Sequence, residues 1–556
     1  MSWFLCVVSQ KPFLEWEIEK FLKVHPQTSN TIIKPSFYFS YDCRAELLYT
    51  KKPSEEDPNL SIVMGNGYIS KSTGYSVADK NDWDKLLNFE YIPNDIDGHF
   101  LALKIRENFL QITTDMFGHY PVYYINFDDY IMVSNKQHFV SQLMGKRQWD
   151  YSSISALTLL TMPLEKKSFL KGISVLGEGA TLTVRNNKIA IANRELKFIS
   201  ESELELQKYL FSFKKAYELQ LNENDFIALP FEASQAARFA FSVWCNKAKK
   251  LYGLYYPSGS EIYPEKFLDS TAINKLKISI IPPFHEPNEV FLLYKDYVLK
   301  TGLSDFPEYF YLAGNYATTS PHIHGGGRGG TNEINLITNQ SEWMFEKEPT
   351  KRIDKIFNIL KGRSFSDFKK NYEGGNHFFR KEFYLFLLKG LKQHFDDCIQ
   401  NMIFTDTIYD KYYFYIKNYH INICAGGIAW LNDFRNFYSP GMFYSLTCQH
   451  LQQRFTNKNI IETSVELHKS FAEESIFYPK PKEVKFTLPV YPNLNQVYFH
   501  LITNEIGQMM ENAQKIPYYN LSSLLKIFKK AKKGNSKAID IVMKWTAFEI
   551  WRGYLE

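Results

Sequence analysis

The hydrophobic pattern of the chain changes near residue 200, and this change limits the folds that the sequence can adopt. Before it, short apolar runs alternate with turn signals, which predicts strands in an all-β or β-rich layered unit. After it, short apolar strands alternate with helical patterns, which predicts a parallel sheet with crossover helices. The strands are expected at 226–229, 251–256 and 278–281, the helices between them at 233–244 and 267–276, and a mainly helical part from about 340 onward.

Glycine and asparagine clusters mark the turns expected in the first unit. Gly65-Asn66-Gly67 separates the apolar runs 61–64 and 68–69 and is predicted to be a turn between two strands. Residues 185–188 separate two alternating runs and predict a hairpin. Both turns favour an antiparallel arrangement in this unit.

Charge and cysteine content exclude several classes of protein. The formal net charge is only +5, from 65 basic and 60 acidic residues, so no nucleic-acid partner is indicated. Six cysteines without a C-x-x-C pair suggest reduced thiols in a cytoplasmic protein. No stretch reaches 18 apolar residues, so no membrane-spanning helix is expected. Aromatic residues make up 16% of the chain, enough apolar bulk for a large core.

Four short strings follow one another in the first unit, at 97–102, 114–124, 133–135 and 169–180. They are D-G-H-F-L-A, T-D-M-F-G-H-Y-P-V-Y-Y, V-S-N, and F-L-K-G-I followed by L-G-E-G-A. In this order they resemble segments of the glutaminase domain of asparagine synthetases. With the predicted parallel sheet, the chain resembles the asparagine synthetase superfamily, which includes β-lactam synthetases and lasso-peptide macrolactam cyclases.

The resemblance implies a fold with two parts. Residues 1–195 would form an α+β, layered, glutaminase-like domain of the Ntn type. Residues 200–556 would form an α/β parallel-sheet domain of the ATP-pyrophosphatase type with a helical C-terminal part. In the family, the first domain releases ammonia from glutamine, and the second activates a carboxylate as an adenylate that an amine attacks. The β-lactam and lasso members use no glutaminase.

The glutaminase nucleophile of the family is a cysteine that follows the initiator methionine, where this chain has Ser2 followed by Trp3. Ser2 is expected to become N-terminal, and an N-terminal serine can act as a nucleophile activated by its own amine. A hydroxyl is nevertheless a much weaker nucleophile than a thiol. Tyr68 also stands where the family's N-G-E string has its acidic residue. We therefore expect a silent glutaminase fold, with Cys6 as an ordinary core thiol.

The phosphate-binding string of the family, S-G-G-x-D-S, should directly follow the first strand of the parallel sheet. This chain has Pro230, Phe231, Glu232 and Ser234 in that region. Pro230 lacks an amide donor, two side chains replace glycines, and the Glu232 carboxylate would face the anion. The loop is therefore expected to have lost the nucleotide, with Glu232 as a Mg²⁺ ligand the alternative.

A glycine-rich segment at 325–333 resembles the family's second signature, G-E-G-G-D-E, without its acidic positions. Arg328 is suited to a carboxylate or phosphate, and Glu333 replaces an acid if the alignment shifts by one. His322 and His324 precede the segment, but two histidines make a weak zinc set, so no metal site is assigned. The candidate binding residues of this segment are Gly327, Arg328, Gly329, Gly330 and Glu333.

Two groups of lysines complete the candidate residues. Lys482 or Lys485 matches the family lysine that stabilises the adenylate or the tetrahedral intermediate, and the spacing does not choose between them. The lysines at 526–533 either attract an acidic peptide or partner, or form the solvated end of a helix.

Three functions are compatible with these residues. The first is a degenerate family member that binds a peptide, a carboxylate substrate or an active synthetase partner in an amide-forming pathway. The second is a working ATP-dependent amide ligase with a rebuilt phosphate site, which would need ATP and Mg²⁺. The third is an N-terminal-serine hydrolase. The loss of three catalytic signatures beside persisting strings favours the first.

Overall fold

A computed structural model describes the two ends of the chain and parts of its middle. For the strands between residues 219 and 438, only the backbone is described. The described residues are 2–193 without 28–29, 44–47, 56, 72–73, 89–94, 128, 146 and 161–166; then 211, 215–216, 219–220, 226–231, 250–255, 279–280, 287–301, 322–324, 346, 348, 351, 378–400, 430–431, 436–438 and 443; and 494–555 without 514–515.

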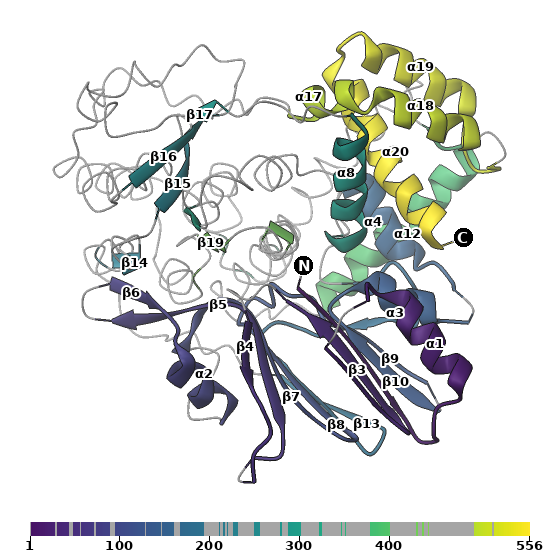
Figure 1. Ribbon diagram of the computed structural model, residues 1–556. Helices are drawn as coiled ribbons and strands as arrows, with labels where there is room; N and C mark the ends of the chain where they lie inside the picture. Colours follow the sequence, from purple (N-terminus) through teal and green to yellow (C-terminus); the bar gives the residue numbers. More distant parts are fainter. Residues whose placement is uncertain are drawn as a thin grey trace.

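Two antiparallel sheets form the first part of the molecule (Figure 1). The first has the strand order β11-β9-β10-β1-β3-β2, with β1 between β10 and β3. Its strands are β1 (Trp3–Ser9), β2 (Thr31–Lys34), β3 (Phe37–Asp42), β9 (Tyr123–Asn126), β10 (Tyr130–Ser134) and β11 (Ser174–Val175).

The second sheet has the order β13-β12-β8-β7-β5-β6-β14, and β4 pairs with β5 outside this path. All of its pairs are antiparallel except the short pair of β14 with β6. Its strands are β4 (Leu48–Lys51), β5 (Leu60–Lys71), β6 (Gly74–Val77), β7 (Asp97–Arg106), β8 (Phe109–Thr114), β12 (Thr181–Arg185), β13 (Lys188–Ala192) and β14 (Leu219–Gln220).

The period of two in β1 shows how the layers are made. Phe4 and Cys6 enter the core between the two sheets, whereas Trp3 and Leu5 point to the opposite side, where helices pack. Helices α1 (Glu15–Val24) and α3 (Gln137–Leu143) cover this outer face, and α2 (Lys80–Leu87) covers the outer face of the second sheet. The predicted β-rich layered unit is confirmed, as an α+β arrangement of helix, sheet, sheet and helix.

The turn predicted at Gly65-Asn66-Gly67 is wrong, because β5 runs through these residues as one continuous strand of 12 residues. The glycines are there to permit close approach of neighbouring chain. A Cβ on Gly65 would lie 2.2 Å from the carbonyl oxygen of His99, and its φ is +108°. A Cβ on Gly67 would lie 2.3 Å from the ring of Trp83. These glycines therefore indicate close packing of the strand against its neighbours, and not a reversal of the chain.

The hairpin predicted at 185–188 is confirmed. It joins β12 and β13, with Arg185 opposite Lys188. Asn186 and Asn187 both have positive φ, 50° and 56°, as a type I′ turn requires. Asparagine tolerates this region of backbone space better than most residues, so the sequence signal and the geometry have the same cause.

A five-stranded parallel sheet lies in the middle of the chain, in the order β17-β16-β15-β18-β19 (Figure 1). The parallel arrangement and the three expected strands are confirmed. The helices expected at 233–244 and 267–276 lie outside the described residues. The strands are β15 (Phe226–Phe231), β16 (Lys250–Tyr255), β17 (Ser279–Ile280), β18 (His322–His324) and β19 (Asn436–Tyr438).

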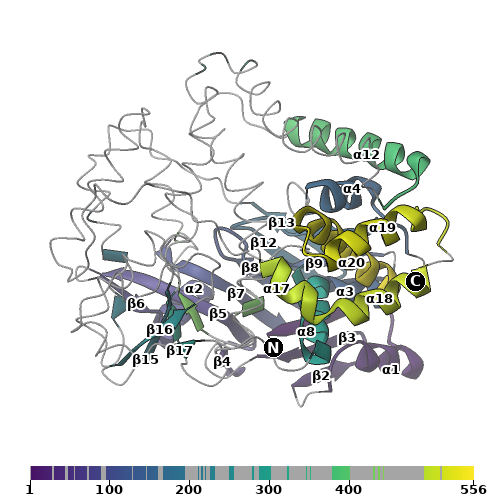
Figure 2. The same ribbon diagram turned by 90° about the horizontal axis from the view of Figure 1, so that it is seen from above.

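Helices from the second half of the chain pack on the helical side of the first sheet (Figures 1 and 2). One hydrophobic core contains both Trp3 and Trp551, and the indole of Trp551 donates a hydrogen bond of 3.1 Å to the carbonyl oxygen of Val298. In the described parts of the chain, no helix is long and apolar enough to cross a membrane. The helices of the second half are α8 (Pro287–Thr301), α12 (Lys381–Gln400), α17 (Leu494–Leu501), α18 (Thr503–Asn512), α19 (Leu521–Lys532) and α20 (Ser536–Leu555). Helix α4 (Tyr151–Leu160), from the first half of the chain, contributes Ile154 and Ala156 to the same core.

Candidate functional site

Ser2 directly precedes β1, and the start of this strand is fixed by Ser134, the last residue of β10, and by Asn135, which follows it. The Asn135 side chain donates a hydrogen bond of 3.1 Å to the carbonyl oxygen of Ser2 and accepts one of 2.9 Å from the amide of Phe4. The Ser134 hydroxyl donates to the carbonyl oxygen of Phe4 at 2.5 Å. The V-S-N string therefore fixes the position of β1 in the sheet, which is a scaffold role that does not depend on catalysis.

The hydroxyl of Ser2 is enclosed and engaged with a thiol. Ser2 has no exposed surface, and its Oγ lies 3.1 Å from the Sγ of Cys43, just beyond the end of β3. In this arrangement the hydroxyl contacts a thiol and is not open to solvent. Cys43 was not singled out from the sequence, because it lies 41 residues away and no local motif marks it. Cys6 is a core thiol, as expected, and burial raises its pKa.

Tyr68, which the resemblance aligns with an acidic substrate contact, is an uncharged aromatic residue. It is buried, and burial raises its pKa well above the usual range for tyrosine. Its ring stacks on Phe443 with the centroids 5.4 Å apart. Tyr75 also contacts Phe443, at 4.6 Å, and donates to the carboxylate of Asp97 at 3.3 Å. Tyr68 and Tyr75, in β5 and β6 of the second sheet, thus both contact Phe443 through their aromatic rings.

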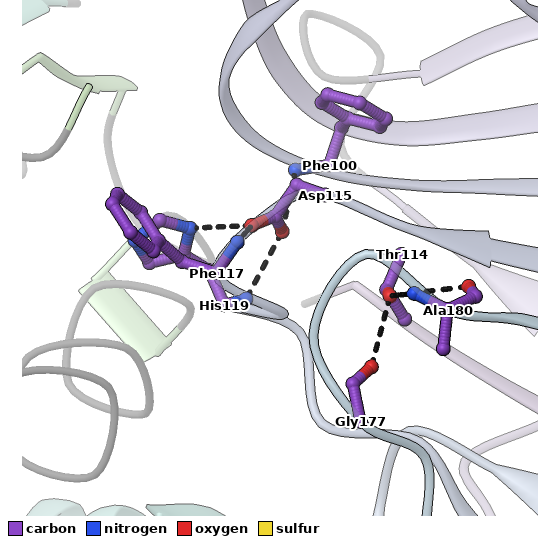
Figure 3. A network of polar contacts seen from close by, with 7 residues as sticks. All are labelled: Phe100, Thr114, Asp115, Phe117, His119, Gly177 and Ala180. Carbon is purple, nitrogen blue, oxygen red and sulfur yellow. Dashed lines mark hydrogen bonds and ion pairs between the residues drawn. The ribbon is translucent and has the colours of Figure 1, made fainter. Parts of the chain in front are cut away.

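The turn after β8 is organised by one buried carboxylate (Figure 3). Asp115 accepts hydrogen bonds from the amides of Phe117 at 2.9 Å and His119 at 3.0 Å, and a longer one of 3.4 Å from Phe100. The Nδ1 of His119 also lies 2.8 Å from this carboxylate. Asp115 and His119 are each 1% exposed. The Asp115 carboxylate thus orients the imidazole of His119 and fixes the turn, and both side chains are buried away from bulk solvent.

The same turn is tied to the last of the four strings (Figure 3). The hydroxyl of Thr114 donates toward the carbonyl oxygens of Gly177 at 3.1 Å and Ala180 at 3.3 Å, and it accepts from the amide of Ala180 at 3.0 Å. The amide of Gly179 donates to the carbonyl oxygen of Asp115 at 2.9 Å. Two strings separated by about sixty residues therefore meet in space and hold each other in place.

At the parallel sheet, the structure describes the strand ends that lead into the two candidate loops. Pro230 and Phe231 are the last residues of β15, with Pro230 opposite Leu254 of β16. His322 and His324 lie in β18, next to β15 on its other side. Among the described residues, no group of three or more His, Cys, Asp or Glu could hold a metal ion. Outside the described residues lie Glu232, Ser234, Gly327, Arg328, Gly329, Gly330, Glu333, Lys482 and Lys485.

Comparison with known proteins assigns no family. No protein-family model matches the chain, and no curated protein matches it. Among solved structures, it is similar at 9% identity to a glutamine phosphoribosylpyrophosphate amidotransferase from B. subtilis complexed with ADP and GMP, with a TM-score of 0.22, over 59% of this chain and 82% of that one. Another, described as the allosteric regulatory enzyme of purine biosynthesis, is 12% identical with a TM-score of 0.19, over 49% of this chain and 63% of that one. Scores this low do not establish a shared fold.

Proposed function

We propose that the chain is an asparagine-synthetase-like protein of an amide-forming pathway, in peptide maturation or small-molecule synthesis. It would have lost catalysis at both sites and would bind a peptide, a carboxylate substrate or an active synthetase partner. The N-terminal unit would be a silent glutaminase-like layer of the Ntn type. Its enclosed Ser2 and uncharged Tyr68 support this assignment and count against a serine hydrolase.

The strand order of the parallel sheet is the observation that carries the proposal. β15 is the first strand of the sheet in sequence, yet it lies between β16 and β18. The chain therefore leaves β15 and β18 in opposite lateral directions, and this topological switch point is where open parallel sheets bind their ligands. The segments that begin at Glu232 and Gly325 both start from this edge. Two candidate loops at one switch point favour a binding cleft.

The residues at this edge favour a ligand other than a nucleotide. Pro230 has no amide to donate to a phosphate, and the carboxylate of Glu232 would repel one. Arg328 in the glycine-rich segment suits a carboxylate, such as an acidic peptide side chain or a C-terminus. We infer a cleft that binds a carboxylate-bearing partner in place of ATP.

Calorimetry with Mg·ATP tests the loss of the nucleotide. We expect a dissociation constant of about 1 mM or weaker, which corresponds to roughly 4 kcal/mol of binding free energy or less. Micromolar binding, or exchange of pyrophosphate into ATP with a candidate substrate, would overturn the degenerate assignment.

Substitution of Arg328 tests the cleft. Arg328→Ala should weaken binding of the natural peptide or partner by about 1.5–3 kcal/mol, because a hydrogen bond to a charged group contributes on that order. Arg328→Lys should recover only part of this, since a point charge cannot reproduce the bidentate fork. Products of the neighbouring genes are the ligands to titrate. Arg185→Ala, at the exposed β12–β13 turn, is the matched control and should bind as the parent does.

The second candidate is a working ATP-dependent amide ligase with a rebuilt phosphate site. The five glycines at 325–330 favour it, because glycines permit close approach of the backbone to a ligand. Lys482 or Lys485 would stabilise the intermediate, with ATP and Mg²⁺ as cofactors. Pyrophosphate exchange that disappears in one lysine variant and persists in the other would establish this function.

A further inference from the structure

Helix α19 lies at the top of Figure 1, away from the antiparallel sheets, and its exposed side carries a stripe of lysines. Lys526, Lys529, Lys530 and Lys533, called the lysine stripe below, are spaced i, i+3, i+4 and i+7 and are all exposed. This spacing places them on one side of the helix over about 10 Å of its axis. The opposite side is buried and consists of Leu524, Ile527, Phe528 and Ala531.

The lysine stripe is charged beyond what solubility requires. Its members repeat at i, i+4 and i, i+3, and like charges at these spacings destabilise a helix. Between Glu511 and Asp540 the sequence has no acidic residue, so α19 itself carries no carboxylate to offset this repulsion. Favourable interaction of the last-turn lysines with the helix dipole offsets part of it, but Lys526 lies too far from the helix end to gain from this.

Helix α1 shows how this protein arranges an ordinary solvated face. Its three glutamates, Glu15, Glu17 and Glu19, are followed by Lys20 and Lys23, so the helix carries both signs of charge. Lys23 pairs with Glu19 at 3.7 Å in the stabilising i, i+4 spacing. Both helices are amphipathic and exposed, yet only α19 concentrates one sign of charge. The difference indicates that the stripe serves recognition.

We propose that the lysine stripe is a docking site for an acidic segment of a partner polypeptide. Its length fits about two turns of a helix that presents carboxylates at i, i+3, i+4 and i+7. Leu525 is 42% exposed and lies one helical turn before Lys529, so it offers an apolar contact beside the charges. The site would be separate from the cleft at β15 and β18, and it does not depend on the function proposed for that cleft.

The chemistry of α19 favours a polypeptide over nucleic acid or a membrane. Between Arg454 and Arg552 the sequence has no arginine, the residue suited to bidentate phosphate contacts. The aromatic ring of α19, Phe528, is buried and cannot stack on a base. One exposed leucine is too little apolar surface to insert into a bilayer, whereas it suits an amphipathic acidic helix.

The test is a titration of the full chain with three labelled probes. The first is a 12-residue peptide with glutamates at i, i+3, i+4 and i+7 beside one leucine; the others are a 12-nucleotide oligouridine and vesicles containing phosphatidylserine. The stripe variant carries Lys→Gln at positions 526, 529, 530 and 533, and the control carries Lys→Gln at the exposed positions 71, 80, 171 and 188. Both variants lose the same charge.

We expect the acidic peptide to bind the parent most tightly of the three probes. The stripe variant should weaken its binding at least tenfold, the control less than twofold, and Leu525→Ser about threefold. Equal weakening in both charge variants, or no binding of the peptide, would refute the proposal. Tighter stripe-dependent binding of the oligouridine or the vesicles would also refute it, in favour of a nucleic acid or a membrane. Because all four lysines are exposed, circular dichroism should show both variants folded.

Discussion

The antiparallel sandwich and the parallel sheet differ in what each keeps of the arrangement that the resemblance implies. In the sandwich, the side chains that fix backbone geometry are present and engaged, as Asp115, Thr114 and Asn135 show. In the parallel sheet, the strand order is present, but the residues after its central strand differ from the phosphate-binding string. Under the proposed function, the architecture would persist at both places while the residues that would touch a substrate differ from those of the family.

The comparison teaches that a sequence resemblance can rest on scaffold residues. The strings at 114–124 and 169–180 meet in space because Thr114 hydrogen-bonds with Gly177 and Ala180, and the amide of Gly179 donates to the carbonyl oxygen of Asp115. The V-S-N string clamps the start of β1. None of these contacts requires a substrate. They can therefore stabilise the fold in a protein that does not catalyse the reaction.

The largest expected effect comes from removing the scaffold carboxylate. Asp115→Ala would leave the buried amides of Phe117 and His119 and the Nδ1 of His119 without their acceptor. Breaking a buried charged network in this way should lower the free energy of unfolding by about 3–5 kcal/mol. The measurement is chemical denaturation followed by fluorescence.

Asp129→Ala is the control for this change. Asp129 also pairs with a cation, Lys11 at 3.1 Å, but both side chains are more than half exposed. An exposed pair contributes about 1 kcal/mol at most, so the midpoint should move little. Equal loss in the two variants would mean that Asp115 is no more important to the scaffold than a surface charge.

A second change sharpens the same point at a glycine. Gly65→Ala should lower the free energy of unfolding by about 1–3 kcal/mol, because its φ of +108° and the carbonyl of His99 leave no room for a Cβ. Gly145→Ala provides the contrast, since nothing lies within 4 Å of its Cβ position. If the two variants unfold together, β5 can rearrange and the close approach is not a constraint.

Local signals predicted part of this fold, and distance in sequence explains what they missed. The hairpin at Asn186-Asn187 and the strands β15 to β17 follow from neighbouring residues, and both were predicted. The glycines at 65 and 67 were misassigned because only the folded neighbours, His99 and Trp83, show why a side chain is excluded.

Long-range contacts carried no local signal at all. The core that joins Trp3 to Trp551 and the thiol of Cys43 beside Ser2 both depend on residues far apart in the chain. For the candidate site, the sequence identified Ser2, Tyr68 and the end of β15, but not that Ser2 is enclosed. The division at 195–200 and the roles of the loop residues remain predictions.

A third change tests the parallel sheet alone. Restoring the family string with Pro230→Ser, Phe231→Gly and Glu232→Gly adds amide donors and removes a like charge beside the phosphates. Affinity for Mg·ATP should rise about tenfold, which is roughly 1.4 kcal/mol. Glu232→Gln alone, which removes the charge but no side-chain bulk, should give a smaller gain. Calorimetry compares the affinity of the three proteins for Mg·ATP. No gain in either variant would mean that residues other than Pro230, Phe231 and Glu232 also prevent nucleotide binding at this edge of the parallel sheet.

The smallest expected effect is at the other end of the comparison, at Ser2. Ammonia release from glutamine should be undetectable in the parent and unchanged in Ser2→Ala. The hydroxyl is enclosed beside Cys43, and Tyr68 stands where the family has an acidic residue. Ser2→Cys, which restores the family nucleophile, should be equally inactive for the same two reasons. An active glutaminase run in parallel shows that the assay can detect ammonia. Release by the parent that Ser2→Ala abolishes would show that the enclosed hydroxyl becomes accessible in solution, and the sandwich would then have kept its chemistry as well as its scaffold.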